Sequence, residues 1–174
     1  MAKFYIIPKG IRMLTPFFGT IVFICLYIIA TFYYPGGSQV DKYSNGFSWS
    51  NNYWCNLLNE TSINGKHNPA RPIAISAMVI LCLSLANFWY IFPEKTATKK
   101  SIRLTIQISG ALAMTISLFL FTSFHDIIII VASLFGMLAI FGTFIILHQL
   151  QWNACFAKDH YRRLAVSPAS IPFE

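Results

Sequence analysis

The sequence predicts an all-α integral membrane bundle of four transmembrane helices, and two observations predict it. Four stretches of about 20 residues, 14–34, 72–92, 104–124 and 127–148, contain no Asp, Glu, Lys or Arg. A helix rises about 1.5 Å per residue, so about 20 apolar residues cross the roughly 30 Å hydrocarbon layer of a bilayer. The chain is also 56% hydrophobic and only 11% charged, whereas a soluble domain carries about 25% charged residues. We therefore expect residues 1–174 to form a single transmembrane domain.

The positive charges predict how this bundle is oriented in the membrane. Ten of the thirteen basic residues lie before the first stretch, between the second and third, or after the fourth, which is one side if there are four crossings. Only Lys42, Lys66 and Arg71 fall on the other side. Because cytoplasmic loops carry the excess of Lys and Arg, both termini are predicted to be cytoplasmic. The net charge of +7 is thus explained by topology and not by nucleic-acid binding.

Residues 14–34 form the first expected span. Pro16 lies in its first turn, where proline is tolerated because its missing N–H has no helical partner there. Its last three residues, 32–34, are aromatic, as is typical of helix ends at the level of the lipid headgroups. The sequence Pro-Gly-Gly at 35–37 then ends the helix.

Residues 35–71 form an aromatic-rich loop that we expect to be ordered and to lie outside. Trp49, Tyr53 and Leu57 recur at intervals of four residues, which would place them on one face of a helix. We therefore predict a helix over residues 48–58 that lies against the outer interface, with Ser48 as its N-cap.

The remaining spans follow with short connections. The second, 72–92, ends in aromatic residues, and residues 93–100 form a short basic cytoplasmic loop. Only a few residues separate the third and fourth spans, 104–124 and 127–148, which predicts an antiparallel helical hairpin. Ser123 or Asp126 is suited to cap the fourth helix, and the tail from Gln149 is expected to be interfacial and basic.

Small residues predict how the helices pack, because they let backbones approach closely in lipid. They recur at helical spacing in the third span at 105, 109, 113 and 117, and in the fourth at 132, 136, 139 and 143. We expect these two seams to face each other within the hairpin, and the alternative is that they bind a second subunit. Asn87 and Gln107 are expected to hydrogen-bond between helices.

His125 and Asp126 are the most suggestive pair for chemistry. A His beside a carboxylate at the membrane boundary could act as a general base, and Glu60 completes the set of candidate catalytic residues. The alternative is that Asp126 caps a helix and His125 lies among the headgroups. No spacing of metal ligands is present, so neither a metal nor another cofactor is predicted. The four cysteines predict no disulfide framework.

The outer loop predicts a second kind of site. Aromatic walls with a few polar groups suit a lipid or another amphiphile. The residues expected to form this outward-facing site are Trp49, Asn52, Tyr53, Trp54, Arg71 and His125. The alternative is an ordered cap, whose aromatic side chains lie in the interface and whose asparagines satisfy turns.

The loop also carries a resemblance. The segments YPGGSQVD (34–41), NGFSWS (45–50) and NYWCNLL (52–58) are similar to those of a group of uncharacterised bacterial multi-pass membrane proteins, a domain-of-unknown-function class. Relatives in that group often have six helices, whereas four are readable here. The resemblance implies a bacterial inner (plasma) membrane location and a helical fold, and it implies no established reaction.

Three hypotheses for function follow. The first is that the protein binds a lipid or another amphiphile at the outward-facing site. The second is an accessory or structural subunit of a larger membrane complex, because no catalytic signature is present. The third is a membrane-embedded lipid-modifying enzyme. Membrane lipids are the expected partners, joined by other membrane subunits under the second hypothesis.

Overall fold

The computed structural model describes residues 14–96, 99–122 and 124–166, with side chains up to residue 151. Within these ranges the chain has four α-helices, one short 3-10 helix and no strand. In chain order they are α1 (Thr15–Phe32), η2 (Trp54–Leu58), α2 (Arg71–Thr96), α3 (Lys100–Ser117) and α4 (His125–Val166). The predicted all-α class is confirmed.

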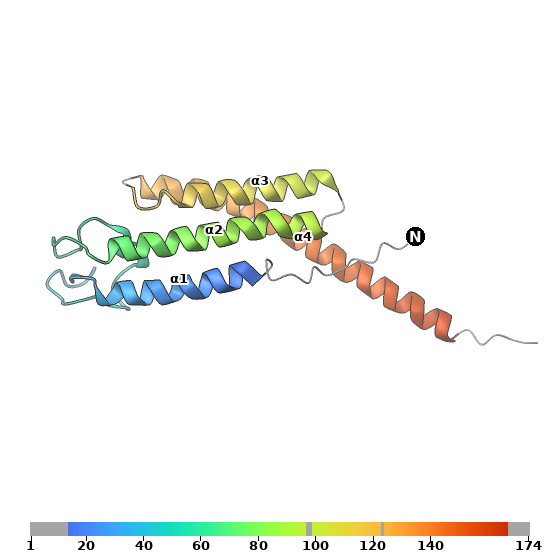
Figure 1. The fold of residues 1–174 in the computed structure, drawn as a ribbon, viewed down its shortest axis with the longest axis horizontal. Coiled ribbons are helices and arrows are strands. Elements are labelled where there is room, and N and C mark those ends of the chain that lie inside the picture. The colour runs from blue at the N-terminus through green and yellow to red at the C-terminus, as the bar shows by residue number, and fades with distance from the viewer. Residues whose placement is uncertain (1–13, 97–98, 123, 167–174) are drawn as a thin grey trace, which may run out of the picture.

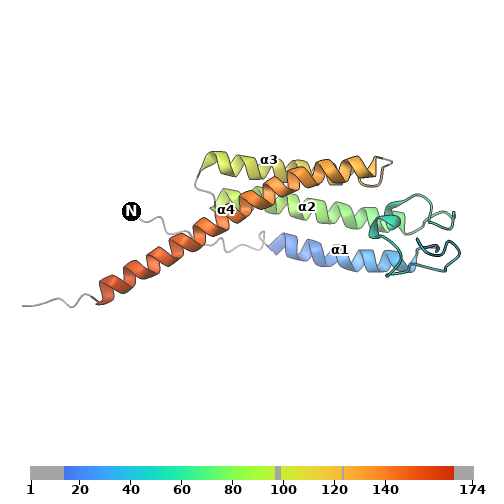
Figure 2. The same cartoon turned by 180° about the vertical axis from the view of Figure 1, so that it is seen from behind.

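The helices form an elongated bundle. α1, α2 and α3 lie side by side, and α4 crosses them obliquely and continues beyond them (Figures 1 and 2). α2 packs between α1 and α3, while α4 packs mainly on α3. Residues 33–70 and the α3–α4 connection lie at one end of the bundle, which we call the loop end (Figure 1). The opposite end, where α2 leads to α3, we call the tail end.

Three helices are long and apolar enough to cross a membrane. They are α1, α2 and the part of α4 over His125–Gln151. α3 is less apolar, because Lys100, Arg103 and Gln107 lie in its first half. The protein therefore has the composition of a helical membrane protein, and the crossing by α3 remains a prediction.

The second and third spans end elsewhere than predicted. α2 continues through Pro93 to Thr96, so the loop expected to start at residue 93 is wrong. Phe92, Pro93 and Thr96 are buried, which shows that tertiary packing extends this helix past its apolar stretch. α3 ends at Ser117 and not at residue 124.

Residues 118–122, predicted as the end of the third span, form successive turns. The backbone N–H groups of Phe119, Leu120 and Thr122 each donate to the carbonyl three residues earlier. Leu120 packs against the buried cluster that includes Ala70 and Leu57. This contact and the reversal into α4 account for the early end of the third helix.

The helix predicted over residues 48–58 is wrong, because only Trp54–Leu58 is helical, as the 3-10 helix η2. The Ser48 carbonyl instead accepts from the N–H groups of Asn51 and Asn52 in a turn. The Asn52 Oδ1 in turn accepts from the Ser48 N–H at 2.9 Å, so Ser48 is not an N-cap. Asparagine side chains often compete in this way with helical hydrogen bonds.

α4 is longer than predicted. It spans 42 residues, or about 63 Å, which is about twice the length needed to cross the hydrocarbon layer. The tail expected from Gln149 thus continues the helix as far as Val166. Asp126 lies in the first turn, where its negative charge interacts favourably with the helix dipole. Ser123, the other predicted cap, lies outside the described residues.

Small and polar side chains join the helices as expected. A Cβ on Gly136 of α4 would lie 4.0 Å from the Cβ of Ala113 on α3, so the two small-residue seams meet within the chain. Gln107 Nε2 of α3 donates to the Tyr90 carbonyl of α2 at 2.8 Å. Asn87 Nδ2 of α2 donates to Thr15 Oγ1 at the start of α1, also at 2.8 Å. The predicted bonding roles of Asn87 and Gln107 are confirmed.

Candidate functional site

The loop end is organised around the side chain of Asn68, which has no exposed surface. Its Nδ2 donates to the carbonyls of Asn56, Leu57 and Asn59 at 3.3, 3.2 and 2.9 Å. Its Oδ1 accepts from the Ala70 N–H at 3.1 Å. Because Asn68 shortly precedes α2, one amide fixes η2 and the residues after it to the start of α2.

A small hairpin over residues 60–68 adds to this arrangement. The Asn68 N–H donates to the Glu60 carbonyl at 3.0 Å, and an antiparallel bridge joins Thr61 to His67. Gly65 turns the hairpin with φ +85°, a conformation that side chains with a Cβ rarely adopt. The base of the hairpin therefore holds the Glu60 backbone close to the first residue of α2, Arg71.

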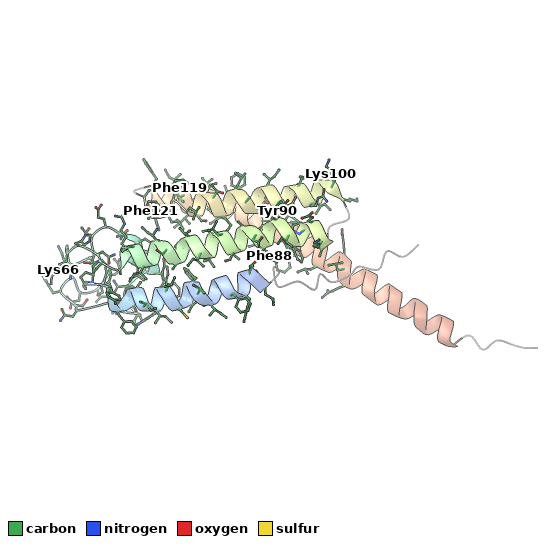
Figure 3. All side chains as sticks on the ribbon, viewed as in Figure 1. Lys66, Phe88, Tyr90, Lys100, Phe119 and Phe121 are labelled. Atoms are coloured by element: carbon green, nitrogen blue, oxygen red, sulfur yellow. The ribbon has the colours of Figure 1, made fainter. Side chains whose placement is uncertain are left out.

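A cleft of about 710 Å³ opens between this loop and the bundle. Its polar side is formed by Asn59, Glu60 and Arg71. Its other walls come from α3, from the turns that follow it and from the start of α4, and they are mostly apolar: Ile116, Phe119, Phe121, Thr122, Phe124 and Ile128. Phe119 and Phe121 lie towards the loop end of the molecule, as does Lys66 at the far tip of the hairpin, whereas Lys100 lies at the tail end (Figure 3). Such a cleft, apolar with a charged rim, can hold an amphiphilic molecule.

Arg71 and Glu60 form a loose ion pair at the rim of the cleft. Arg71 Nη1 lies 4.0 Å from Glu60 Oε2, which is longer than a hydrogen bond. The Glu60 side chain is 77% exposed and the Arg71 side chain 29%. Arg71 Nε is buried and has no hydrogen-bond partner, although a buried polar group normally has one. The 4.0 Å pair therefore leaves the guanidinium only loosely bound in a wall of the cleft.

Aromatic residues line a separate, smaller cavity of about 140 Å³ on the α1 side of the loop. Trp54 stacks on Tyr27 of α1 with ring centroids 5.4 Å apart. Trp49 meets the Trp54 ring edge-on at 6.4 Å. We call this cavity the aromatic groove, and its lining residues are Ile24, Tyr27, Ile28, Thr31, Phe47, Trp49, Trp54 and Leu57. It offers an apolar contact surface with few polar groups.

The six residues predicted for a single lipid site are divided by the fold. Trp49 and Trp54 line the aromatic groove, whereas Arg71 lines the cleft, and the two cavities share no lining residue. Tyr53 is exposed and lines neither cavity.

Asn52, another of these six residues, is buried and acts within the loop. Its Nδ2 donates to the Gly37 carbonyl at 2.8 Å, and its Oδ1 accepts from Ser48. Asn52 and Asn68 therefore have the turn-satisfying role that was the alternative interpretation of the loop.

The candidate catalytic residues are only partly brought together. His125 Nδ1 lies 3.3 Å from Asp126 Oδ1, and the Asp126 side chain is almost fully exposed. Neither residue is among those that line the cleft, although Phe124 and Ile128 are. Glu60 does line it and pairs with Arg71. The structure therefore places Glu60 with Arg71, apart from the His125–Asp126 pair.

Cys55 of η2 lies in the electrostatic field of the α4 start. Burial raises the pKa of the Cys55 thiol, and the negative charge of Asp126 raises it further. Cys25, Cys55 and Cys82 are free thiols. Among the described residues, no group of three or more His, Cys, Asp or Glu side chains could hold a metal ion.

The role of Asn68 in the loop end and the place of Phe119 and Phe121 in the cleft wall were not predicted from the sequence. Asn68 carried a detectable signal, because an Asn-Pro pair directly before an apolar span marks a turn. Phe119 and Phe121 carried none, because their apolar run was indistinguishable from the end of a span.

No match to this chain is found among protein-family models, curated proteins or solved structures. The resemblance based on the loop segments therefore remains a prediction.

Proposed function

We propose that this protein crosses the inner membrane of a bacterium four times, with the loop end outside and both termini in the cytoplasm. α2 and α4 both run from the loop end to the tail end (Figures 1 and 2). The chain must therefore return through α3, whose 18 residues extend about 27 Å. The excess of Lys and Arg at the tail end and the termini supports the cytoplasmic orientation.

Within this topology, we propose that the cleft binds the headgroup region of a lipid or another amphiphile. The observation that carries this proposal is the pairing of an apolar wall with Arg71, whose side chain is 29% exposed and only loosely paired with Glu60. An apolar chain would cover Phe119, Phe124 and Ile128, while a polar head would reach the guanidinium.

Native mass spectrometry of protein released from lipid nanodiscs tests this proposal. Wild type should retain lipid, and Thr122→Trp should retain less because the indole occupies part of the cleft. Thr115→Trp is the matched control, since Thr115 is an exposed residue of α3 outside the cleft. Absence of retained lipid in wild type, or equal retention in Thr122→Trp, would contradict lipid binding in the cleft.

A second candidate function is that of an accessory subunit, and the exposure of α4 favours it. Only 6% of the most apolar stretch of α4 is buried within the bundle, compared with 22% for α1 and for α2. Its length beyond the bundle would offer a further surface to a partner (Figure 2). Either lipid or another membrane subunit would cover this face.

Site-specific photo-crosslinking in native membranes separates these two cases. A photoreactive residue at Leu138 of α4 should give one discrete protein adduct if a subunit binds there. The same residue at Val79, exposed on α2, is the control and should give lipid adducts. Lipid adducts at both positions would remove the subunit proposal.

A further inference from the structure

The rim of the cleft presents two opposite charges with little mutual bonding. The 4.0 Å separation of Arg71 Nη1 and Glu60 Oε2 leaves both groups with hydrogen-bonding capacity. The backbone of each residue is fixed, because Asn68 bonds to the Glu60 carbonyl through its N–H and accepts the Arg71 N–H through its own carbonyl. The two residues therefore lie next to each other on the rim, with their charged groups 4.0 Å apart.

This pair is matched to a zwitterion. A guanidinium binds a phosphate through charge-assisted hydrogen bonds, and the positive end of the α2 dipole acts in the same direction. A carboxylate binds a primary ammonium, which can donate up to three hydrogen bonds. A purely anionic head would satisfy Arg71 but would meet repulsion from Glu60. A quaternary ammonium would satisfy the charge of Glu60 but has no N–H to donate.

We propose that the cleft selects an aminophospholipid head of the phosphoethanolamine type, with its phosphate on Arg71 and its ammonium on Glu60. The inference rests on the proposed lipid-binding function and specifies its ligand. The acyl chains would extend along the apolar wall that contains Phe119, Phe121 and Phe124. No covalent step is involved, so the site acts by binding alone.

Lipid competition in nanodiscs tests the selection. Full-length protein is placed in nanodiscs with equal parts of phosphatidylethanolamine, phosphatidylcholine and phosphatidylglycerol, and the retained lipid is identified by native mass spectrometry. Wild type should retain phosphatidylethanolamine over each of the others by about tenfold, the effect of one charge-assisted hydrogen bond. Soluble phosphoethanolamine, added as a competitor, shows whether the head alone suffices or the acyl chains are needed.

Variants of Glu60 and Arg71 test which residue binds the ammonium and which binds the phosphate of the head. Glu60→Gln should abolish the preference over phosphatidylcholine while lipid is still retained, and Arg71→Gln should lower retention of all three lipids. Arg71→Lys keeps the charge without the planar fork and should give an intermediate result, provided that it elutes as a folded monodisperse protein. Asp126→Asn and Lys66→Gln are matched controls, because both residues are exposed and lie outside the cleft.

The outcomes separate the two proposals. Retention that is sensitive to Thr122→Trp but shows no headgroup preference would overturn the aminophospholipid inference and leave lipid binding intact. No retention in wild type would overturn both. A preference that is unchanged in both Glu60→Gln and Arg71→Gln would show that another surface selects the head.

Discussion

At the scale of single residues, Asn68 makes four side-chain hydrogen bonds from a fully buried position. The two hydrogens of its Nδ2 are shared among the carbonyls of Asn56, Leu57 and Asn59, at the end of η2, and the Asn56 carbonyl also accepts from the Asn59 N–H. Buried backbone groups without a partner are costly, so this amide substitutes for regular secondary structure in the loop. The position of Glu60 beside Arg71 depends on it, which makes Asn68 a positioning residue for the cleft.

Asn68→Ala should lower the free energy of unfolding by about 3 kcal/mol, because several buried backbone groups lose their partner. Chemical unfolding in detergent, followed by tryptophan fluorescence, measures the change. Asn64→Ala is the matched control: its Oδ1 accepts two hydrogen bonds in a partly exposed hairpin, and we expect a loss of about 1 kcal/mol or less. Equal losses in the two variants would contradict the central role of Asn68.

Cys55 supplies a pH-dependent prediction. Its raised pKa reduces the fraction of thiolate near pH 8, and the thiolate is the form that reacts with iodoacetamide. In a variant whose other cysteines are serine, Cys55 should therefore be alkylated slowly, and the rate should rise at higher pH than for an exposed thiol. Asp126→Asn removes a charge that raises the pKa, so alkylation at pH 8 should become faster.

Asp126→Glu keeps that charge and should leave the rate of Cys55 alkylation close to that of the parent. If Asn and Glu at this position give the same rate, the charge of residue 126 does not reach η2, and burial alone raises the pKa.

At the scale of elements, the helices are joined through small residues at specific contacts. Gly110 of α3 faces Trp89 of α2, Gly19 of α1 faces Ser84 of α2, and Gly142 of α4 faces Ile106 of α3. Hydrophobic burial between helices is weak in lipid, so close packing of this kind supplies much of the attraction. None of these three glycines belongs to the two seams predicted from the sequence, which meet instead at Ala113 and Gly136.

Gly110→Ala should destabilise the α2–α3 contact, because the added Cβ would overlap the Trp89 side chain. Overpacking of this kind costs about 1–3 kcal/mol. Gly136→Ala is the matched control: its Cβ would meet only Ala113 at an ordinary distance of 4.0 Å, and helix propensity favours alanine. Thermal unfolding in detergent should show a lower midpoint for Gly110→Ala alone, and equal midpoints would contradict the packing.

At the scale of the whole molecule, the direction of each helix determines the membrane topology. Because α3 and α4 run antiparallel, a crossing by α3 returns the chain to the loop end before α4 begins (Figure 1). The charged residues at the start of α3 then lie at the tail end, the side that the positive-inside rule assigns to the cytoplasm.

Single cysteines placed at Lys66, Lys99 and Lys158 in an otherwise cysteine-free full-length chain test the topology. A membrane-impermeant maleimide should label Lys66→Cys in intact cells, and should label the other two only after the membrane is opened. If α3 does not cross, Lys158→Cys is labelled from outside, opposite to Lys99→Cys. This result would also overturn the four-crossing proposal.

The class of the protein and the approximate course of its spans could be predicted from the sequence. Apolar runs about as long as a bilayer is thick are a local property, and the crossing helices satisfy their own backbone groups, so no distant contact is needed to recognise them. The same holds for the order of the helices and the short α3–α4 connection. For Asn87 and Gln107 the bonding role could be predicted, whereas the partners, Thr15 and Tyr90, lie on other helices and could not.

Helix ends and the candidate cleft were decided only by tertiary structure. Pro93 lies within α2, where it is buried together with Phe92 and Thr96. Residues 118–122 form turns that pack Leu120 against the buried cluster of the loop end, and Asn52 stabilises a turn where a helix was expected. Glu60 and Arg71 meet because the Asn68 amide joins segments that are separated in sequence. Such contacts depend on the positions of several elements at once, so residue spacing along the chain could not reveal them.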